Sequence, residues 1–209
     1  MSKIEEVKAK VQAGKAKLIP GLVQEAIDEG NAPRDILQAM IDSLGVVGDL
    51  FSKGDVFVPE MLMAAKAMSK GVEVLKPHLV GDSVSSLGTC IIGTVEGDLH
   101  DIGKNLVKMM LESAGFNMVD LGVDVSAAKF IEAIKENENV TLVACSGLLT
   151  STMTAMGATI KTIKASGLKV KVIVGGAPVT AEFAAEIGAD GFAPDAGSAA
   201  VKAKELVNA

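Results

Sequence analysis

The hydrophobic pattern of the chain changes character once, near residue 80. Up to about residue 78, apolar residues recur at helical spacing in four segments joined by short connections: 4–14, 18–30, 32–54 and 58–76. Pro33 and Pro59 stand near the starts of the last two segments, where proline is tolerated, and Gly54 stands at a segment end. This pattern predicts a small bundle of four helices.

From about residue 85, short apolar runs alternate with amphipathic segments. The apolar runs are 87–95, 117–122, 141–147, 169–176 and 188–194, and the helical segments that follow them are 103–115, 126–137, 152–166, 180–187 and 196–208. The runs are apolar almost throughout, as in strands covered on both faces. Five such units predict an open, doubly wound, five-stranded parallel sheet. We expect a helical cap domain at 1–80, a Gly- and Ser-containing linker at 81–88 and a Rossmann-like domain at 89–209.

Composition narrows the range of functions. Hydrophobic residues make up 49% of the chain and charged residues 22%, as in folded globular proteins. A net charge of -6 and an aromatic content of 3% argue against binding to nucleic acid. No apolar run is long enough to span a membrane, and the N-terminus lacks the apolar core of a signal peptide, so we expect a cytoplasmic protein. Cys90 and Cys145 lie in strand-like runs and are expected to be reduced core residues.

Polar residues gather where three of the predicted strands end, at 97–103, 145–152 and 174–180. The carboxyl ends of parallel strands share one edge of a sheet, so these loops are expected to lie close together. The first loop contains His100, with Asp98 two residues before it. An aspartate that holds one ring nitrogen fixes the tautomer and leaves the other nitrogen free as a base or a metal ligand.

Taken alone, these residues leave several kinds of site open. His100 could be a helix-capping or solvated loop residue. A protein-only zinc site is disfavoured, because it needs three or four ligands and the two histidines and two cysteines are scattered. Ser146 or Ser151 could join a nucleophile–histidine–acid triad, but the Gly-x-Ser-x-Gly elbow is absent. A metal that arrives already coordinated and needs one protein ligand fits a single histidine better.

Three motifs, in this order, resemble the signature of cobalamin-binding domains with a flavodoxin-like fold: Asp98-x-His100-x-x-Gly103, Ser146-x-Leu148 and Gly175-Gly176. In that family a histidine replaces the cofactor's own base below the cobalt. The resemblance therefore implies cobalamin or a related corrinoid, carrying its methyl group as methylcobalamin, in the base-off, His-on form. It implies that His100 is the ligand of the cobalt and that Asp98 is hydrogen-bonded to the imidazole.

The resemblance also implies the remaining site residues. Thr152 stands where the methionine synthase branch has a serine, so the implied ligand–acid–hydroxyl relay is His100, Asp98 and Thr152. The implied cofactor contacts in the sheet domain are Gly97, Asp98, Leu99, His100, Asp101, Gly103, Ser146, Leu148, Thr150, Gly175, Gly176 and Ala196. The helical half resembles the cap of methyl-carrying corrinoid domains, and the residues matching those that cover the upper face of the corrin are Phe51, Val58, Met61 and Leu62.

The resemblance covers about residues 3–208 and is strongest to the stand-alone corrinoid proteins of methylamine, methanol and aryl methyl ether methyltransferase systems. It implies a methyl carrier: cob(I)alamin on the chain takes a methyl group from a substrate-specific methyltransferase, and a second methyltransferase delivers it to tetrahydrofolate or coenzyme M. A reductive activase is a further expected partner. The chain would be a methyl-carrying subunit that is not catalytic alone. The alternatives are a mutase small subunit, a cobalamin-responsive regulator and a cobalamin-free enzyme with His100 as general base.

Overall fold

A computed structural model describes residues 2–78 and 87–208, apart from the side chains of Ser52 and Lys76. The chain divides into two compact units, Met1–Ser85 and Ser86–Ala209. The linker predicted at 81–88 lies outside the described residues, except for Leu87 and Gly88. No helix in the described part of the chain is long and apolar enough to cross a membrane.

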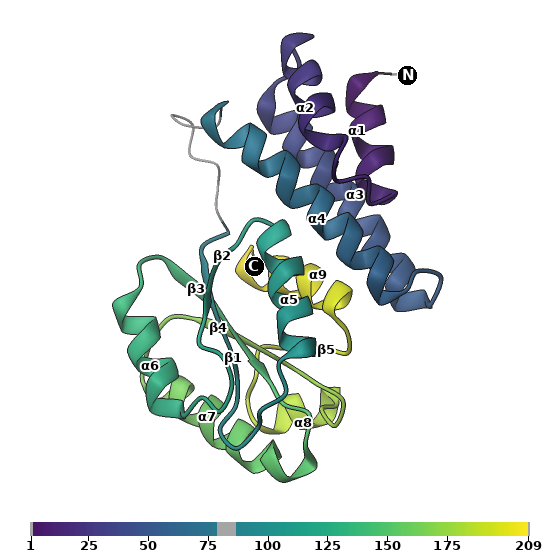
Figure 1. Ribbon diagram of the computed structural model, residues 1–209. Coiled ribbons are helices and arrows are strands. Elements are labelled where there is room, and N and C mark those ends of the chain that lie inside the picture. The colour runs from purple at the N-terminus through teal and green to yellow at the C-terminus, as the bar shows by residue number, and fades with distance from the viewer. Residues whose placement is uncertain (1, 79–86, 209) are drawn as a thin grey trace. The chain divides into compact units, whose positions relative to one another are not determined.

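The first unit is a four-helix bundle, as predicted. Its helices are α1 (Lys3–Gln12), α2 (Ile19–Asp28), α3 (Pro33–Lys53) and α4 (Val58–Leu75), followed by the short 3-10 helix η1 (Lys76–His78). Helix α3 packs against both α1 and α4, and α2 packs against α1 and α4 (Figure 1). Apart from Ser43, whose hydroxyl donates to the Ala39 carbonyl at 2.8 Å, the buried side chains along these helices are apolar and recur at helical spacing, so the pattern that predicts the helices also builds their core.

Local signals set the ends of these helices. The Ser2 hydroxyl accepts a hydrogen bond from the Glu5 amide at the start of α1. Pro33 opens α3, and Gly54 ends it with φ at 81°, a left-handed conformation that glycine adopts without strain. The Glu60 carboxylate accepts a hydrogen bond from the Phe57 amide just before α4.

The second unit is built on a parallel sheet of five strands in the order β2-β1-β3-β4-β5. The strands are β1 (Thr89–Thr94), β2 (Asn117–Asp120), β3 (Val140–Ser146), β4 (Lys171–Gly175) and β5 (Gly191–Ala193). This is the flavodoxin-like order, with β1 and β3 on either side of the point where the chain reverses its direction of winding. Such a point is where ligands bind in open sheets of this class.

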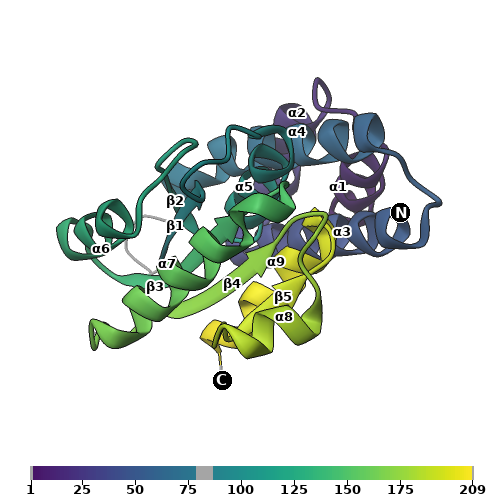
Figure 2. The same cartoon turned by 90° about the horizontal axis from the view of Figure 1, so that it is seen from below.

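Helices cover both faces of the sheet, which is why every residue of the inner strand β1 is buried. Helices α5 (Ile102–Ser113) and α9 (Ala196–Val207) pack against each other on one face. Helices α6 (Ala127–Glu136), α7 (Met153–Ala165) and α8 (Ala181–Glu186) cover the other face (Figure 2). The predicted α + α/β fold is therefore confirmed: a four-helix bundle followed by a flavodoxin-like doubly wound sheet.

The strand register brings the predicted loops to one edge of the sheet. Thr94 of β1 pairs with Ser146 of β3, Ser146 pairs with Gly175 of β4, and Gly175 pairs with Ala193 of β5. Each of these residues is the last of its strand. The loops that follow β1, β3 and β4 therefore start side by side, as the sequence predicts.

Both cysteines are buried, unpaired residues of inner strands of the sheet. Cys90 lies in β1 and Cys145 in β3. Burial raises the pKa of the Cys145 thiol to about 12 and also raises that of Cys90. Both thiols are therefore protonated core groups at neutral pH, as expected from the sequence.

Candidate functional site

The site is built around His100, on the loop between β1 and α5. Its Nδ1 atom lies 2.7 Å from Oδ1 of Asp98, and its backbone N–H donates to the same oxygen at 3.0 Å. The Thr94 hydroxyl at the end of β1 donates to the His100 carbonyl at 2.9 Å. These contacts fix both the backbone and the ring of His100, while half of its side chain remains exposed.

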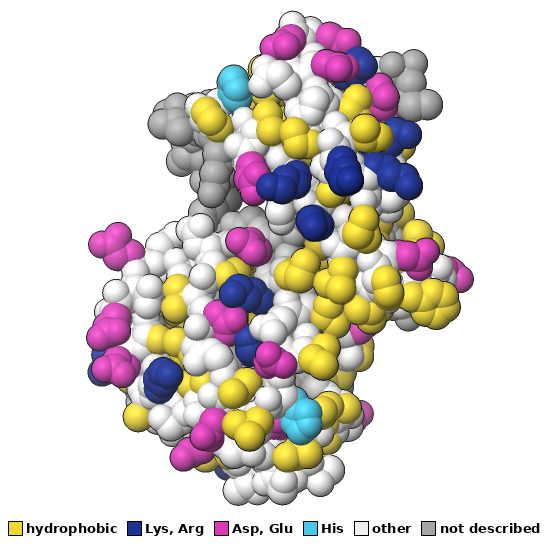
Figure 3. All heavy atoms as spheres, in the orientation of Figure 1, with side chains coloured by type: hydrophobic (Ala, Val, Ile, Leu, Met, Phe, Trp, Pro, Cys, Tyr) yellow, Lys and Arg dark blue, Asp and Glu magenta, His cyan; other side chains and the backbone are white. Residues whose placement is uncertain are grey.

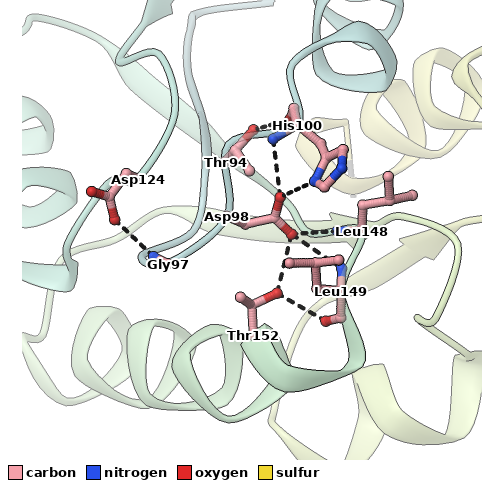
Figure 4. A network of polar contacts seen from close by, with 8 residues as sticks. All are labelled: Thr94, Gly97, Asp98, His100, Asp124, Leu148, Leu149 and Thr152. Carbon is pink, nitrogen blue, oxygen red and sulfur yellow. Dashed lines mark hydrogen bonds and ion pairs between the residues drawn. The ribbon is translucent and has the colours of Figure 1, made fainter.

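The Asp98 carboxylate connects this loop to the loop after β3. Its Oδ2 atom accepts hydrogen bonds from the backbone N–H groups of Leu148, at 2.6 Å, and Leu149, at 3.2 Å. Figure 4 shows these hydrogen bonds converging on the carboxylate. The carboxylate side chain is 0% exposed. A buried carboxylate with this many donors is satisfied in its charged form.

Thr152 completes this network of hydrogen bonds, and its role in a relay stays a prediction. Its Oγ1 atom lies 3.1 Å from Oδ2 of Asp98 and 2.9 Å from the carbonyl oxygen of Leu149, so its single hydrogen is shared between two acceptors. Thr152 closes the short 3-10 helix η2 (Thr150–Thr152), directly before α7. His100, Asp98 and Thr152 therefore form one connected group.

The hydrogen bonds decide the charge of Asp98. Burial alone would raise the pKa of this carboxyl, but hydrogen bonds from Leu148, His100 and Leu149 hold its pKa well below the ordinary value. An ionised carboxylate can only accept, so Nδ1 of a neutral His100 must be the donor. The lone pair of the imidazole is then on Nε2, which makes this atom available as a ligand or a base.

A second ionic contact, which was not predicted, fixes the helix that follows His100. The Lys104 side chain in the first turn of α5 is 2% exposed, and its Nζ atom lies 2.7 and 2.8 Å from the two carboxylate oxygens of Asp120 at the end of β2. Lys104 also donates to Asn105 Oδ1 at 2.7 Å, and Lys108 lies 3.2 Å from Asp120. Burial raises the pKa of Asp120, but its contacts with Lys104 and its other donors outweigh burial and lower it.

The predicted glycines differ in what their missing side chains would meet. A Cβ atom on Gly176, whose φ is 130°, would lie 1.8 Å from the Gly147 carbonyl oxygen, and one on Gly175 would lie 2.8 Å from the Ala193 carbonyl oxygen. Those two positions require glycine for the fold itself. A Cβ atom on Gly103 would meet nothing within 4 Å, so packing within the described protein does not require glycine there.

Apolar side chains around the network are exposed. Leu99 is 71% exposed and Ile102 is 77% exposed, and Leu148 and Leu149 are exposed as well. Figure 3 shows hydrophobic side chains gathered beside the histidine of the sheet unit. We call Leu99, Ile102, Leu148 and Leu149 the apolar rim. An apolar group at the site could cover the rim and remove it from water.

The other predicted contacts of the sheet unit lie on these loops, at the end of β3 and at the start of α9. Gly97 and Asp101 are exposed on the His100 loop, and Thr150 is exposed on the loop after β3. Ser146 is half-buried at the end of β3. Ala196, the first residue of α9, is buried.

The predicted residues of the helical unit differ in exposure. Met61 is buried, Phe51 and Leu62 are half-buried, and Val58 is exposed. Phe57, which was not among the predicted residues, is 68% exposed. Contact between this unit and a cofactor stays a prediction.

Comparison with known proteins identifies the family of both units. Residues 88–202 match a family model described as a B12 binding domain, and residues 3–76 match a second model with the same description. The dimethylamine corrinoid protein 3 of Methanosarcina acetivorans is 42% identical to this chain over 191 residues, which cover 88% of this chain and 89% of that protein.

Solved structures agree with this assignment. A cobalamin-binding protein from Desulfitobacterium hafniense DCB-2 is 29% identical, with a TM-score of 0.84 over 97% of this chain and 98% of that one. The methanol:cobalamin methyltransferase complex MtaBC from Methanosarcina barkeri contains a chain that is 30% identical, with a TM-score of 0.81 over 99% of this chain and 80% of that one. This chain therefore belongs to the B12-binding corrinoid proteins of methyltransferase systems.

Proposed function

We propose that this chain is the methyl-carrying component of a corrinoid-dependent methyltransferase system and that His100 binds the cobalt from below. The observation that carries the proposal is the hydrogen bond between Nδ1 of His100 and the buried Asp98 carboxylate, which leaves Nε2 as the available nitrogen. When bound, the corrinoid would supply the cobalt centre that takes up and releases the methyl group. The relatives named above, which include corrinoid proteins and a cobalamin methyltransferase complex, support this role.

The residues at the sheet edge fit a corrinoid. The flat face of a corrin ring is largely apolar and needs apolar surface beside its ligand, and the apolar rim supplies it. It also needs close approach to the backbone, and Gly103 leaves space for that because a Cβ atom there would meet nothing within 4 Å. Gly97, Asp101, Ser146 and Thr150 are the proposed polar and backbone contacts.

Within this proposal the three residues of the network have distinct tasks. His100 presents Nε2 as the lower ligand, in place of the cofactor's own base. Asp98 orients the ring and, by accepting the hydrogen bond from Nδ1–H, strengthens Nε2 as an electron-pair donor to a metal. Thr152 holds the Asp98 carboxylate and can share a proton with it when the strength of the histidine ligand changes.

The further assignments follow the same proposal. Phe51, Val58, Met61 and Leu62 of the helical unit would cover the methyl-bearing face and keep water away from it. The partners would be a substrate-specific methyltransferase, an acceptor methyltransferase that uses tetrahydrofolate or coenzyme M, and a reductive activase. The expected location is the cytoplasm.

A methyl-transfer assay with His100→Gln tests this function. The glutamine variant is expected to retain some corrinoid, because the apolar rim and the glycines are unchanged, but to transfer the methyl group at least about tenfold more slowly, as expected when a metal ligand or its orienting partner is lost. The assay follows the corrinoid spectrum after adding a methylamine or methanol methyltransferase with its substrate. Equal rates for the wild type and the variant would contradict the role of His100.

A further inference from the structure

Asp124, on the loop between β2 and α6, makes two contacts with the loop that carries His100. Its side-chain Oδ1 atom accepts a hydrogen bond from the Gly97 backbone N–H at 2.7 Å (Figure 4). Its own backbone N–H donates to the Asp98 carbonyl at 3.0 Å. The two contacts point in opposite directions, so one residue both donates to the His100 loop and accepts from it.

The backbone of Asp124 restricts which residues can make this pair of contacts. Its φ is 53°, and Gly97 opposite has φ at 82°. Aspartate and asparagine tolerate the left-handed region better than other residues with side chains. Both also place an acceptor oxygen at the same distance from the backbone. Glycine would keep the backbone conformation and lose the acceptor, and alanine would lose the acceptor and add strain.

The His100 loop is therefore held from two neighbouring strand ends. On the β3 side, the Asp98 side chain accepts from Leu148 and Leu149. On the β2 side, Asp124 fixes the Asp98 carbonyl and the Gly97 amide. The first set of contacts fixes where the carboxylate points, and the second fixes the peptide groups that carry it.

We propose that Asp124 is a positioning residue for the cobalt ligand: by holding Gly97 and Asp98, it sets the direction from which His100 presents Nε2. This inference rests on the proposed function, since it assigns a task within the same site. Asp124 touches neither His100 nor a reacting atom in the described contacts, so its effect passes through the backbone of the loop.

Three variants at this position separate the hydrogen bond from the backbone conformation. Asp124→Asn keeps the acceptor and the left-handed backbone, Asp124→Gly keeps only the backbone, and Asp124→Ala keeps neither. Asn139, directly before β3, is the other non-glycine residue with positive φ in the described chain, at 51°. Asn139→Ala is the matched control, because it adds the same kind of strain at the opposite end of a strand.

Two measurements are made on the full-length chain. The first is amide hydrogen exchange at Gly97 without cofactor. It is expected to be about fivefold faster in Asp124→Gly and Asp124→Ala, the factor that corresponds to one ordinary hydrogen bond of about 1 kcal/mol. The second is a titration with hydroxocobalamin, read from the absorption bands of the histidine-ligated form. The same two variants are expected to need an about fivefold higher corrinoid concentration for half-saturation. For Asp124→Asn and Asn139→Ala, this concentration is expected to stay within about twofold of the wild-type value.

The possible results distinguish failure of the positioning role of Asp124 from failure of the proposed function. Faster Gly97 exchange with an unchanged titration would overturn the positioning role and leave Asp124 as a turn residue. Unchanged exchange at Gly97, or faster exchange throughout the sheet unit, would also overturn it. If Asp124→Ala does not fold, Asp124→Gly against Asp124→Asn gives the same comparison. A wild-type chain that retains no histidine-ligated corrinoid would instead contradict the proposed function, on which this role depends.

Discussion

At the scale of single residues, the buried carboxylate of Asp98 is the group that connects the loops of the site. It receives hydrogen bonds from two loops and has no exposure to water. Its pKa is below the ordinary value because its donors stabilise the charged form more than burial disfavours it. A folded-state pKa below the unfolded one means that Asp98 stabilises the fold fully above about pH 4, and that this contribution is lost as the pH falls below that value.

Asp98→Asn is therefore expected to lower the free energy of unfolding by about 2 kcal/mol at pH 7, since the amide group turns one acceptor into a donor facing backbone N–H groups. The difference from the wild type should narrow between about pH 4 and pH 3. Urea unfolding at several pH values measures both effects. Thr152→Val, which removes one donor of the network, is the milder control at about 1 kcal/mol. A difference that is equal at pH 7 and pH 3 would contradict the account of Asp98.

Only part of the hydrogen-bond network around Asp98 could be predicted from the sequence. Asp98, His100 and Thr152 were predicted, because side chains with chemistry stood at strand ends and matched a family signature. The amides of Leu148 and Leu149 were missed as partners of Asp98, because a backbone donor has no signature in the residue type. Asp124 was missed because its role depends on a left-handed backbone beside Gly97, which the sequence does not reveal.

At the scale of elements, every predicted helix and strand in the described chain is present. The strands were found because apolar residues fill both of their faces. Two features could not be predicted. The pairing of the strand-end residues Thr94, Ser146, Gly175 and Ala193 with one another depends on the register between strands that are distant in sequence. The Lys104–Asp120 ion pair joins α5 to β2, the strand that follows it in the chain. It was not predicted because a lysine on an amphipathic helix is ordinarily expected in solvent.

Two glycines at the ends of these elements are expected to respond differently to the same change. Gly176→Ala places a methyl group against the Gly147 carbonyl, at a backbone angle unfavourable for alanine, and should destabilise the fold by on the order of 3 kcal/mol. Gly103→Ala lies in the first turn of α5 with free space around it, so the protein should be as stable as the wild type or up to about 1 kcal/mol more stable.

A measurement of corrinoid binding shows whether a glycine is needed for the fold or for contact with the cofactor. If a corrinoid approaches the backbone of α5, the stable Gly103→Ala variant should bind hydroxocobalamin more weakly than the wild type. Thermal unfolding and a spectroscopic titration, made on the same samples, test both halves of this prediction. A Gly103→Ala chain with unchanged affinity would show that the cofactor does not come close to Gly103.

At the scale of the whole molecule, the chain consists of two compact units. The hydrogen-bond network of His100, Asp98 and Thr152 lies entirely in the second unit, on the loops after β1 and β3. The two family matches follow the same division, with one in the helical part and the other in the sheet part. The sequence predicted this organisation because its hydrophobic period changes once.

A fragment of residues 87–209 is expected to fold alone and to bind hydroxocobalamin through His100, whereas a fragment of residues 1–78 should fold as a helical bundle and bind none. Circular dichroism and absorption spectra after desalting check both fragments. A sheet fragment that folds but needs the helical fragment for histidine ligation would show that the ligand site is shared between the units.

The central claim, that His100 is the lower ligand of a bound corrinoid, is tested most directly by one absorption spectrum. The purified chain is incubated with hydroxocobalamin and desalted, with His100→Ala treated in parallel. We predict corrinoid bands at close to one per chain in the wild type and altered bands in the variant. Bands that are identical in both proteins would contradict the assignment of His100 as the cobalt ligand. A wild type without retained bands would contradict corrinoid binding itself.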